Sequence, residues 1–176
     1  YYNNLDRFIS SSFYADSLPN YINFFNSNLN LQNYRDSLWT KVLNDSLYLK
    51  HSREDYFIGE VDWYKVEHDM IIESKNEIND YNPTFPISFD KDHDPGEELM
   101  GTPWFDEVMI DLCKLIIDEE NLGADEDPDI LFVGFSAMDY IIHNYGPFSQ
   151  EAMDYFIRLD MQLDRFLNHI VLLWPA

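Results

Sequence analysis

The segment from residue 130 to residue 135 limits the fold of this chain more than any other. It is an unbroken apolar run, Ile-Leu-Phe-Val-Gly-Phe, and such runs are typical of strands buried on both faces. Asp139 and His143 follow shortly after it. Positions four apart lie on the same face of a helix, so the carboxylate and the imidazole can converge on one point. Because open α/β sheets bind their ligands at the carboxyl ends of strands, we expect a site here.

The chemistry of Asp139 and His143 fits a metal site. A carboxylate oxygen and a neutral imidazole nitrogen both ligate zinc, at about 2.0–2.2 Å. The alternative is a hydrogen-bonded pair that only holds a loop in place, which the same spacing allows. Gly146 and Pro147 are a stop signal just beyond the pair, and this favours the metal interpretation.

A longer set of motifs surrounds this pair. Residues 139–147 follow the pattern D-x-x-x-H-x-x-G-P, and residues 158–167 follow R-L-D-x-x-L-x-x-F-L. Thr-Pro at 102–103, Glu-Asn-Leu-Gly at 120–123 and the segment 9–26 add to the set. Together they resemble the alkaline phosphatase superfamily. The most similar branch contains the type I phosphodiesterases, the nucleotide pyrophosphatases and the phosphate-irrepressible bacterial alkaline phosphatases.

The chain departs from the family pattern at two places. Ile142 stands where relatives carry a small residue before the ligand histidine, which concerns the packing around the metal. Trp-Phe-Asp at 104–106 stands where relatives often have a Gly-Asn step. We expect the second departure to change only how the helix begins.

The resemblance implies a zinc-dependent phosphate monoester hydrolase that acts on small phosphate esters through a covalent phosphoenzyme. It assigns Asp139 and His143 to one of two zinc ions and suggests a periplasmic or secreted location. A phosphodiesterase or nucleotide pyrophosphatase of the same superfamily is one alternative. A non-catalytic acidic domain, whose Asp-His pair is only structural, is another.

The family's nucleophile, its K-x-R substrate-binding segment and its remaining zinc ligands have no counterpart in these 176 residues. We therefore expect an internal segment of a larger enzyme, inactive by itself, in which no catalytic residue beyond the two ligands can be assigned. The last six residues match nothing in the family pattern.

The predicted fold class is α/β, part of an alkaline-phosphatase-like sheet flanked by helices, with an irregular cap insertion. Residues 1–28 and 96–176 are assigned to the core, and the polar, aromatic-rich residues 29–95 to the insertion. The last part of the core is expected to run helix, buried strand, metal loop, helix.

Local patterns predict the individual elements. Residues 9–14 favour a strand, and apolar spacing over 34–49 favours a helix. Thr102 and Pro103 are typical of a helix start, and Gly123 of its end. The last helix is expected to begin near Ser149 and to bury five apolar residues: Met153, Phe156, Leu163, Leu167 and Ile170. Asp160 falls on that stripe, so it needs a partner there.

Charge and cysteine content exclude some functions. The net charge of −22 and the lack of a basic patch argue against a nucleic-acid partner. No apolar stretch of about 18 residues is present, so no transmembrane segment is expected. The single cysteine, Cys113, excludes an internal disulfide and is expected in the core.

Overall fold

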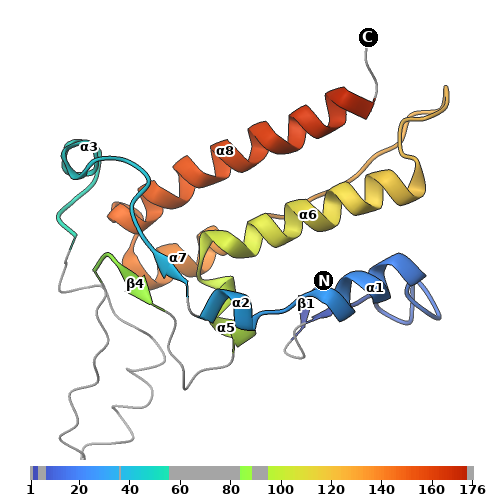
Figure 1. The fold of residues 1–176 in the computed structure, drawn as a ribbon, viewed down its shortest axis with the longest axis horizontal. Coiled ribbons are helices and arrows are strands. Elements are labelled where there is room, and N and C mark those ends of the chain that lie inside the picture. Colours follow the sequence, from blue (N-terminus) through green and yellow to red (C-terminus); the bar gives the residue numbers. More distant parts are fainter. Residues whose placement is uncertain (1, 4–6, 36, 56–83, 89–94, 174–176) are drawn as a thin grey trace, which may run out of the picture.

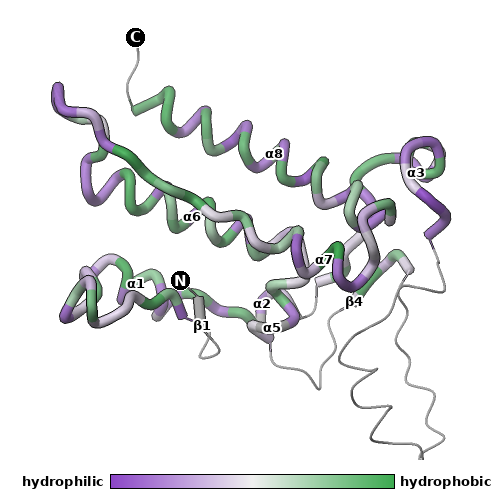
Figure 2. The backbone as a smooth tube through the Cα atoms, turned by 180° about the vertical axis from the view of Figure 1, so that it is seen from behind, coloured by the Kyte–Doolittle hydropathy of each residue, from purple (hydrophilic) through white to green (hydrophobic). Residues whose placement is uncertain are grey.

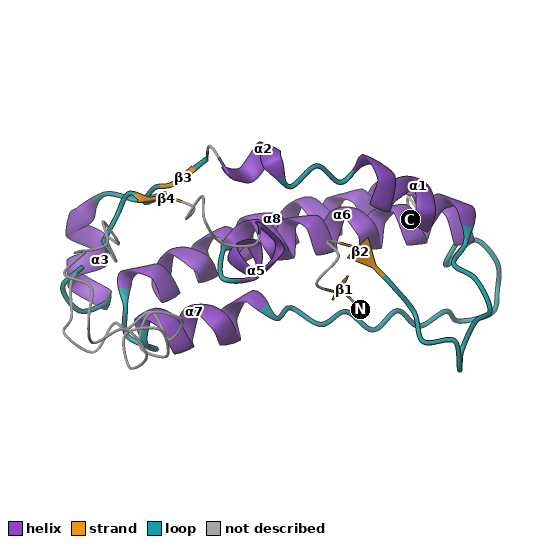
Figure 3. Cartoon of the chain, turned by 90° about the horizontal axis from the view of Figure 1, so that it is seen from below, coloured by secondary structure: helices purple, strands orange, loops and turns teal. Residues whose placement is uncertain are grey.

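The computed structural model describes residues 2–3, 7–35, 37–55, 84–88 and 95–173. Their elements, in chain order, are β1 (Tyr2–Asn3), β2 (Arg7–Phe8), α1 (Asn20–Asn28), α2 (Gln32–Arg35), β3 (Leu38–Trp39), α3 (Asp45–His51), β4 (Ile87–Ser88), α5 (Pro95–Met100), α6 (Pro103–Glu120), α7 (Ala137–Tyr145) and α8 (Gln150–Leu173). In Figure 1 the long helices α6 and α8 lie side by side, and α7 packs against both near one end of the pair. Figure 3 shows the same arrangement from below.

Helix α6 forms where the sequence predicted it. Thr102 is its N-cap and Pro103 its first residue, a position where the missing N–H costs nothing. Its buried residues include Phe105, Val108 and Leu112, and Cys113 lies among them, where burial raises the pKa of the thiol. The helix ends at Asn121 in the left-handed conformation (φ 53°), two residues before the expected Gly123.

The expected helix over residues 34–49 is wrong. The segment instead contains α2, β3 and the start of α3. Strand β3 pairs antiparallel with β4, with Trp39 opposite Ile87. Trp39 is almost fully buried, and its indole is held by α8, so contacts made by the fold outweigh the local helical spacing.

The expected strand over residues 9–14 is also wrong. Strand β2 ends at Phe8, and a turn follows in which the N–H of Tyr14 donates to the carbonyl of Ser11. The side-chain amide of Asn26 bonds both the N–H and the carbonyl of Phe8, each at 2.8 Å. Phe13 and Tyr14 are exposed, and none of the strands in the described residues pairs with this segment.

The apolar run 130–135 is extended, but the expectation that both of its faces are buried is wrong. It runs back along α6 toward α7 (Figure 2). Leu131, Val133 and Phe135 are half-buried, whereas Ile130 is 77% exposed and Phe132 is 91% exposed. A buried strand needs hydrogen-bonded neighbours on its edges. None of the strands in the described residues pairs with this segment.

Helix α8 begins as predicted but buries a different face. The Ser149 hydroxyl accepts a hydrogen bond from the N–H of Ala152 at 3.0 Å, which is N-cap geometry. Phe156, Leu167 and Asp160, all expected inside, are exposed, so the prediction for these three is wrong. The other residues of the expected stripe, Met153, Leu163 and Ile170, are half-buried. The buried positions are largely polar: Gln150, Glu151, Ala152, Asp154, Tyr155 and Gln162.

Asp154 is the reason that α8 buries this polar face. Its side chain is fully buried and accepts hydrogen bonds from Trp39 Nε1 at 2.6 Å and from the N–H of Val42 at 2.9 Å. Tyr48 donates its hydroxyl to the same carboxylate, and Arg158 donates Nε at 2.6 Å. One carboxylate thereby ties the segment from β3 to α3 onto α8.

This network predicts a loss of stability at alkaline pH. Burial raises the pKa of Tyr48 to about 12, and the bond to Asp154 adds to the effect. An unfolded tyrosine ionises near pH 10, so the Tyr48 contribution is complete below about pH 10 and is lost toward about pH 12. The free energy of unfolding should fall by about 1.4 kcal/mol per pH unit in this window. Urea unfolding at several pH values between about 10 and 12 measures this fall. The free energy of unfolding of Tyr48→Phe should decrease less steeply with pH than that of the unmodified protein, and an equal decrease would contradict this account.

Candidate metal site

Helix α7 carries the two residues that the sequence singled out. It is nine residues long and buries Ala137, Ile141 and Tyr145 against the rest of the core. It ends at Gly146, whose φ of +86° is open to glycine without strain. A Cβ at this position would also lie 3.1 Å from the Arg53 guanidinium. Glycine at position 146 therefore serves both the turn after α7 and the close contact with the Arg53 guanidinium.

Asp139 and His143 lie together on the outer face of α7. Asp139 Oδ1 and His143 Nε2 are 3.5 Å apart, and the side chains are 79% and 67% exposed. This distance is long for a hydrogen bond, and an exposed ion pair adds little stability. The contact between Asp139 and His143 alone would therefore contribute little to holding a loop in place.

The separation of the two atoms fits a shared zinc ion. Two donors at about 2.1 Å from a tetrahedral ion lie roughly 3.4 Å from each other, close to the observed 3.5 Å. Zinc takes four ligands, and Asp139 and His143 supply two. In the part of the chain that the structure describes, no third His, Cys, Asp or Glu joins them in a metal-binding group. Asp139 and His143 could therefore supply at most one half of a tetrahedral coordination shell.

The two sequence departures have different structural consequences. Ile142 is half-buried beside His143 on α7. Asp106, in the second departure, was expected to affect only the start of α6. It is instead fully buried and bonded to Tyr155 on α8 at 2.6 Å. A single sequence carries no signal for this role, because the partner is 49 residues away.

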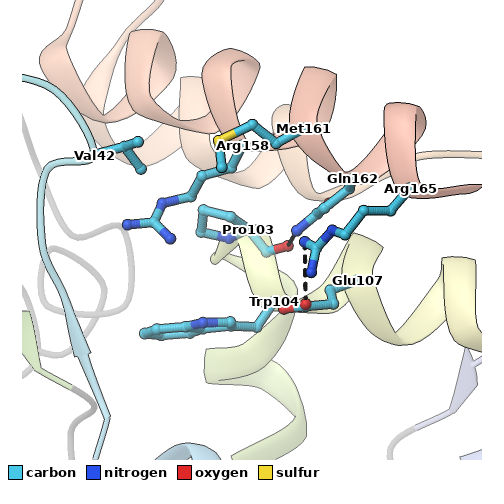
Figure 4. A pocket seen from close by; sticks show the side chains of 8 residues that line it. All are labelled: Val42, Pro103, Trp104, Glu107, Arg158, Met161, Gln162 and Arg165. Carbon is cyan, nitrogen blue, oxygen red and sulfur yellow. Dashed lines mark hydrogen bonds and ion pairs between the residues drawn. The ribbon is translucent and has the colours of Figure 1, made fainter.

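A small cavity of about 110 Å³ lies between the start of α6 and the middle of α8 (Figure 4). Gln162 Nε2 donates to the carbonyl of Pro103 at 3.3 Å across it, and Arg165 pairs with Glu107 at 3.4 Å. Its lining is Val42, Pro103, Trp104, Glu107, Arg158, Met161, Gln162 and Arg165. No residue of α7 contributes, so the cavity is separate from the metal-site candidate.

The family follows from a profile comparison. The sequence profile of "Type I phosphodiesterase / nucleotide pyrophosphatase" matches residues 7–171. The chain belongs to this family. The expected membership in the alkaline phosphatase superfamily is thereby confirmed.

Three curated relatives are similar to most of this chain. Alkaline phosphatase PafA of Elizabethkingia meningoseptica is 30% identical, over 93% of this chain and 28% of the relative. Alkaline phosphatase PhoV of Synechococcus elongatus is 27% identical, over 93% and 27%. A calcium-transporting ATPase of Myroides odoratus is 28% identical, over 92% and 28%. The chain therefore spans less than a third of the length of each relative.

Solved structures support the same fold. A mutant of alkaline phosphatase PafA matches with a TM-score of 0.79 at 27% identity, over 98% of this chain and 31% of that one. Wild-type PafA matches with a TM-score of 0.75 at 26% identity, over the same shares. The predicted fold class, part of an alkaline-phosphatase-like α/β fold, is confirmed. Among the described helices, none combines the length and the hydropathy that a membrane crossing requires.

Proposed function

We propose that the protein carrying this chain is a zinc-dependent phosphate monoester hydrolase. The observation that carries the proposal is the convergence of Asp139 Oδ1 and His143 Nε2, 3.5 Å apart, on the exposed face of α7. It is supported by the match to the PafA fold and by the similarity to two alkaline phosphatases.

In this proposal, Asp139 and His143 hold one of two zinc ions. Asp139 binds through its carboxylate, and His143 binds through Nε2 of a neutral imidazole. Zinc supplies Lewis-acid stabilisation of the charge that develops on phosphoryl oxygens. The reaction passes through a covalent phosphoenzyme on a Thr or Ser nucleophile, as in the superfamily. No residue of this chain is assigned as that nucleophile.

The strongly acidic composition agrees with a metal-dependent mechanism. The net charge of −22 repels an anionic phosphate ester. Two divalent cations dominate the local field at a site whatever the distant surface carries. A metal centre is therefore the feature that would let this protein bind its substrate.

A phosphodiesterase or nucleotide pyrophosphatase is the second candidate function. The family that matches residues 7–171 is named for these activities. Monoester hydrolysis is preferred because two of the three curated relatives are alkaline phosphatases.

The superfamily resemblance also suggests where the protein is located. We propose that it is periplasmic or secreted, which fractionation of the source cells would test.

Paired substrates distinguish the two candidates. The full-length protein, reconstituted with zinc, should hydrolyse p-nitrophenyl phosphate faster than bis-p-nitrophenyl phosphate. A chelator should remove the activity, and zinc should restore it. Faster hydrolysis of the diester would favour the second candidate. Activity that survives complete metal removal would contradict the zinc proposal.

A further inference from the structure

Arg53 holds the C-terminal end of α7. Its guanidinium donates a hydrogen bond to the carbonyl of Tyr145, the last residue of the helix. A Cβ at Gly146 would lie 3.1 Å from the guanidinium, so the Arg53 side chain would have to move by a few tenths of an ångström. The Arg53 backbone is itself fixed, because its N–H donates to Phe148 at 2.9 Å and its carbonyl accepts from Gln150 at 3.0 Å. The cation therefore sits on well-anchored backbone.

Asp106 lies near the opposite end of α7, where its Oδ1 is buried without a hydrogen-bond partner among the described residues. Its buried carboxylate accepts a hydrogen bond from the Tyr155 hydroxyl at 2.6 Å. Burial raises the pKa of Asp106, while Tyr155 and the backbone amides of Ala137 and Ser136 act in the opposite direction. Those two amides lie at the first turn of α7. The carboxylate thus faces the amino end of the helix.

The two charges match the dipole of α7. A helix carries partial positive charge at its N-terminus and partial negative charge at its C-terminus, so a carboxylate at the first and a guanidinium at the second both stabilise it. Such contacts are strongest in partly buried geometry. Binding sites require their side chains to be held within about 0.5 Å and 10–20° of the working geometry. Fixing both ends restricts rotation and sliding of the helix.

We propose that Arg53 and Asp106 are positioning residues that hold α7, and with it Asp139 and His143, in register for metal binding. This inference rests on the proposed function of that pair. It gives residues 29–95, expected as an insertion, a direct connection to the site, because Arg53 comes from that segment and contacts the metal-site helix. It also assigns Asp106 a role in positioning α7, in addition to its place in the first turn of α6.

The test uses the full-length protein, zinc affinity measured by competition with a chelating dye, and hydrogen exchange of the amides of residues 137–145. Arg53→Gln and Asp106→Asn should each weaken zinc binding by about 10–100-fold, the usual effect of removing a residue that orients a ligand. Exchange within α7 should become faster. Arg53→Lys, which keeps the charge, should recover part of both effects.

Arg165→Gln is the matched control. It removes an arginine of α8 that pairs with Glu107 on α6, and it should change neither measurement. Unchanged zinc affinity in both Arg53→Gln and Asp106→Asn would overturn the inference. So would faster exchange spread evenly over the protein, since that indicates general loosening. If His143→Ala leaves zinc affinity unchanged, the proposed function fails, whatever the Arg53 variants show.

Discussion

In the full-length protein, the proposed function predicts that replacing His143 by alanine reduces phosphatase turnover by roughly a thousandfold or more while leaving the fold intact. Loss of a metal ligand removes several kcal/mol of transition-state stabilisation, and each 1.4 kcal/mol corresponds to about tenfold in rate. The side chain is 67% exposed, and α7 buries its opposite face. Its removal therefore creates no cavity in the core. The measurements are kcat on p-nitrophenyl phosphate, zinc content after dialysis and the far-ultraviolet circular dichroism spectrum.

His169→Ala serves as the histidine control for this experiment. His169 lies on α8, and its Nε2 is 3.0 Å from Asp118 Oδ1 on α6. An exposed pair of this kind contributes about 0–1 kcal/mol, so activity and zinc content should stay near those of the unmodified protein. Full activity in His143→Ala would show that the site lies elsewhere.

The convergence of Asp139 and His143 was predictable because its signals are local, although the sequence predicted a metal loop where the structure has the helix α7. Asp139 and His143 are four residues apart, and Gly146 directly follows the last turn. A helix of this length needs only its own spacing and its stop signal to bring the two side chains together. Helix α6 was predictable for the same reason, from Thr102 and Pro103.

The residues that hold these helices in place were not predictable, because their signals are long-range. Asp106 meets Tyr155 from 49 residues away, and Arg53 meets Tyr145 from 92 residues away. Nothing in one sequence marks such a partner. The apolar run 130–135 illustrates the reverse case, because its composition predicted burial that the described strands do not provide.

The prediction of which face of α8 is buried was wrong for a physical reason, which also predicts the effect of replacing Asp154. A hydrophobic stripe places Phe156 and Leu167 inside, yet both are exposed, while Asp154 on the same helix is fully buried. A buried carboxylate is tolerated only when donors satisfy it. Trp39, Tyr48, the Val42 amide and Arg158 do so together, and none of these bonds can be seen from the helix alone.

Asp154→Ala should lower the free energy of unfolding by about 3–5 kcal/mol, because it leaves the buried donors of its partners unsatisfied and Arg158 without its counter-ion. Asp164→Ala, an exposed aspartate on the same helix, should change it by no more than about 0.5 kcal/mol. Thermal unfolding of both variants, followed by circular dichroism and calorimetry, measures the difference. Similar stability of the two variants would show that the Asp154 hydrogen bonds only balance the cost of burying its charge. The segment from β3 to α3 would then have to be held by apolar packing, such as the contacts of Trp39 with Phe85 and Tyr145.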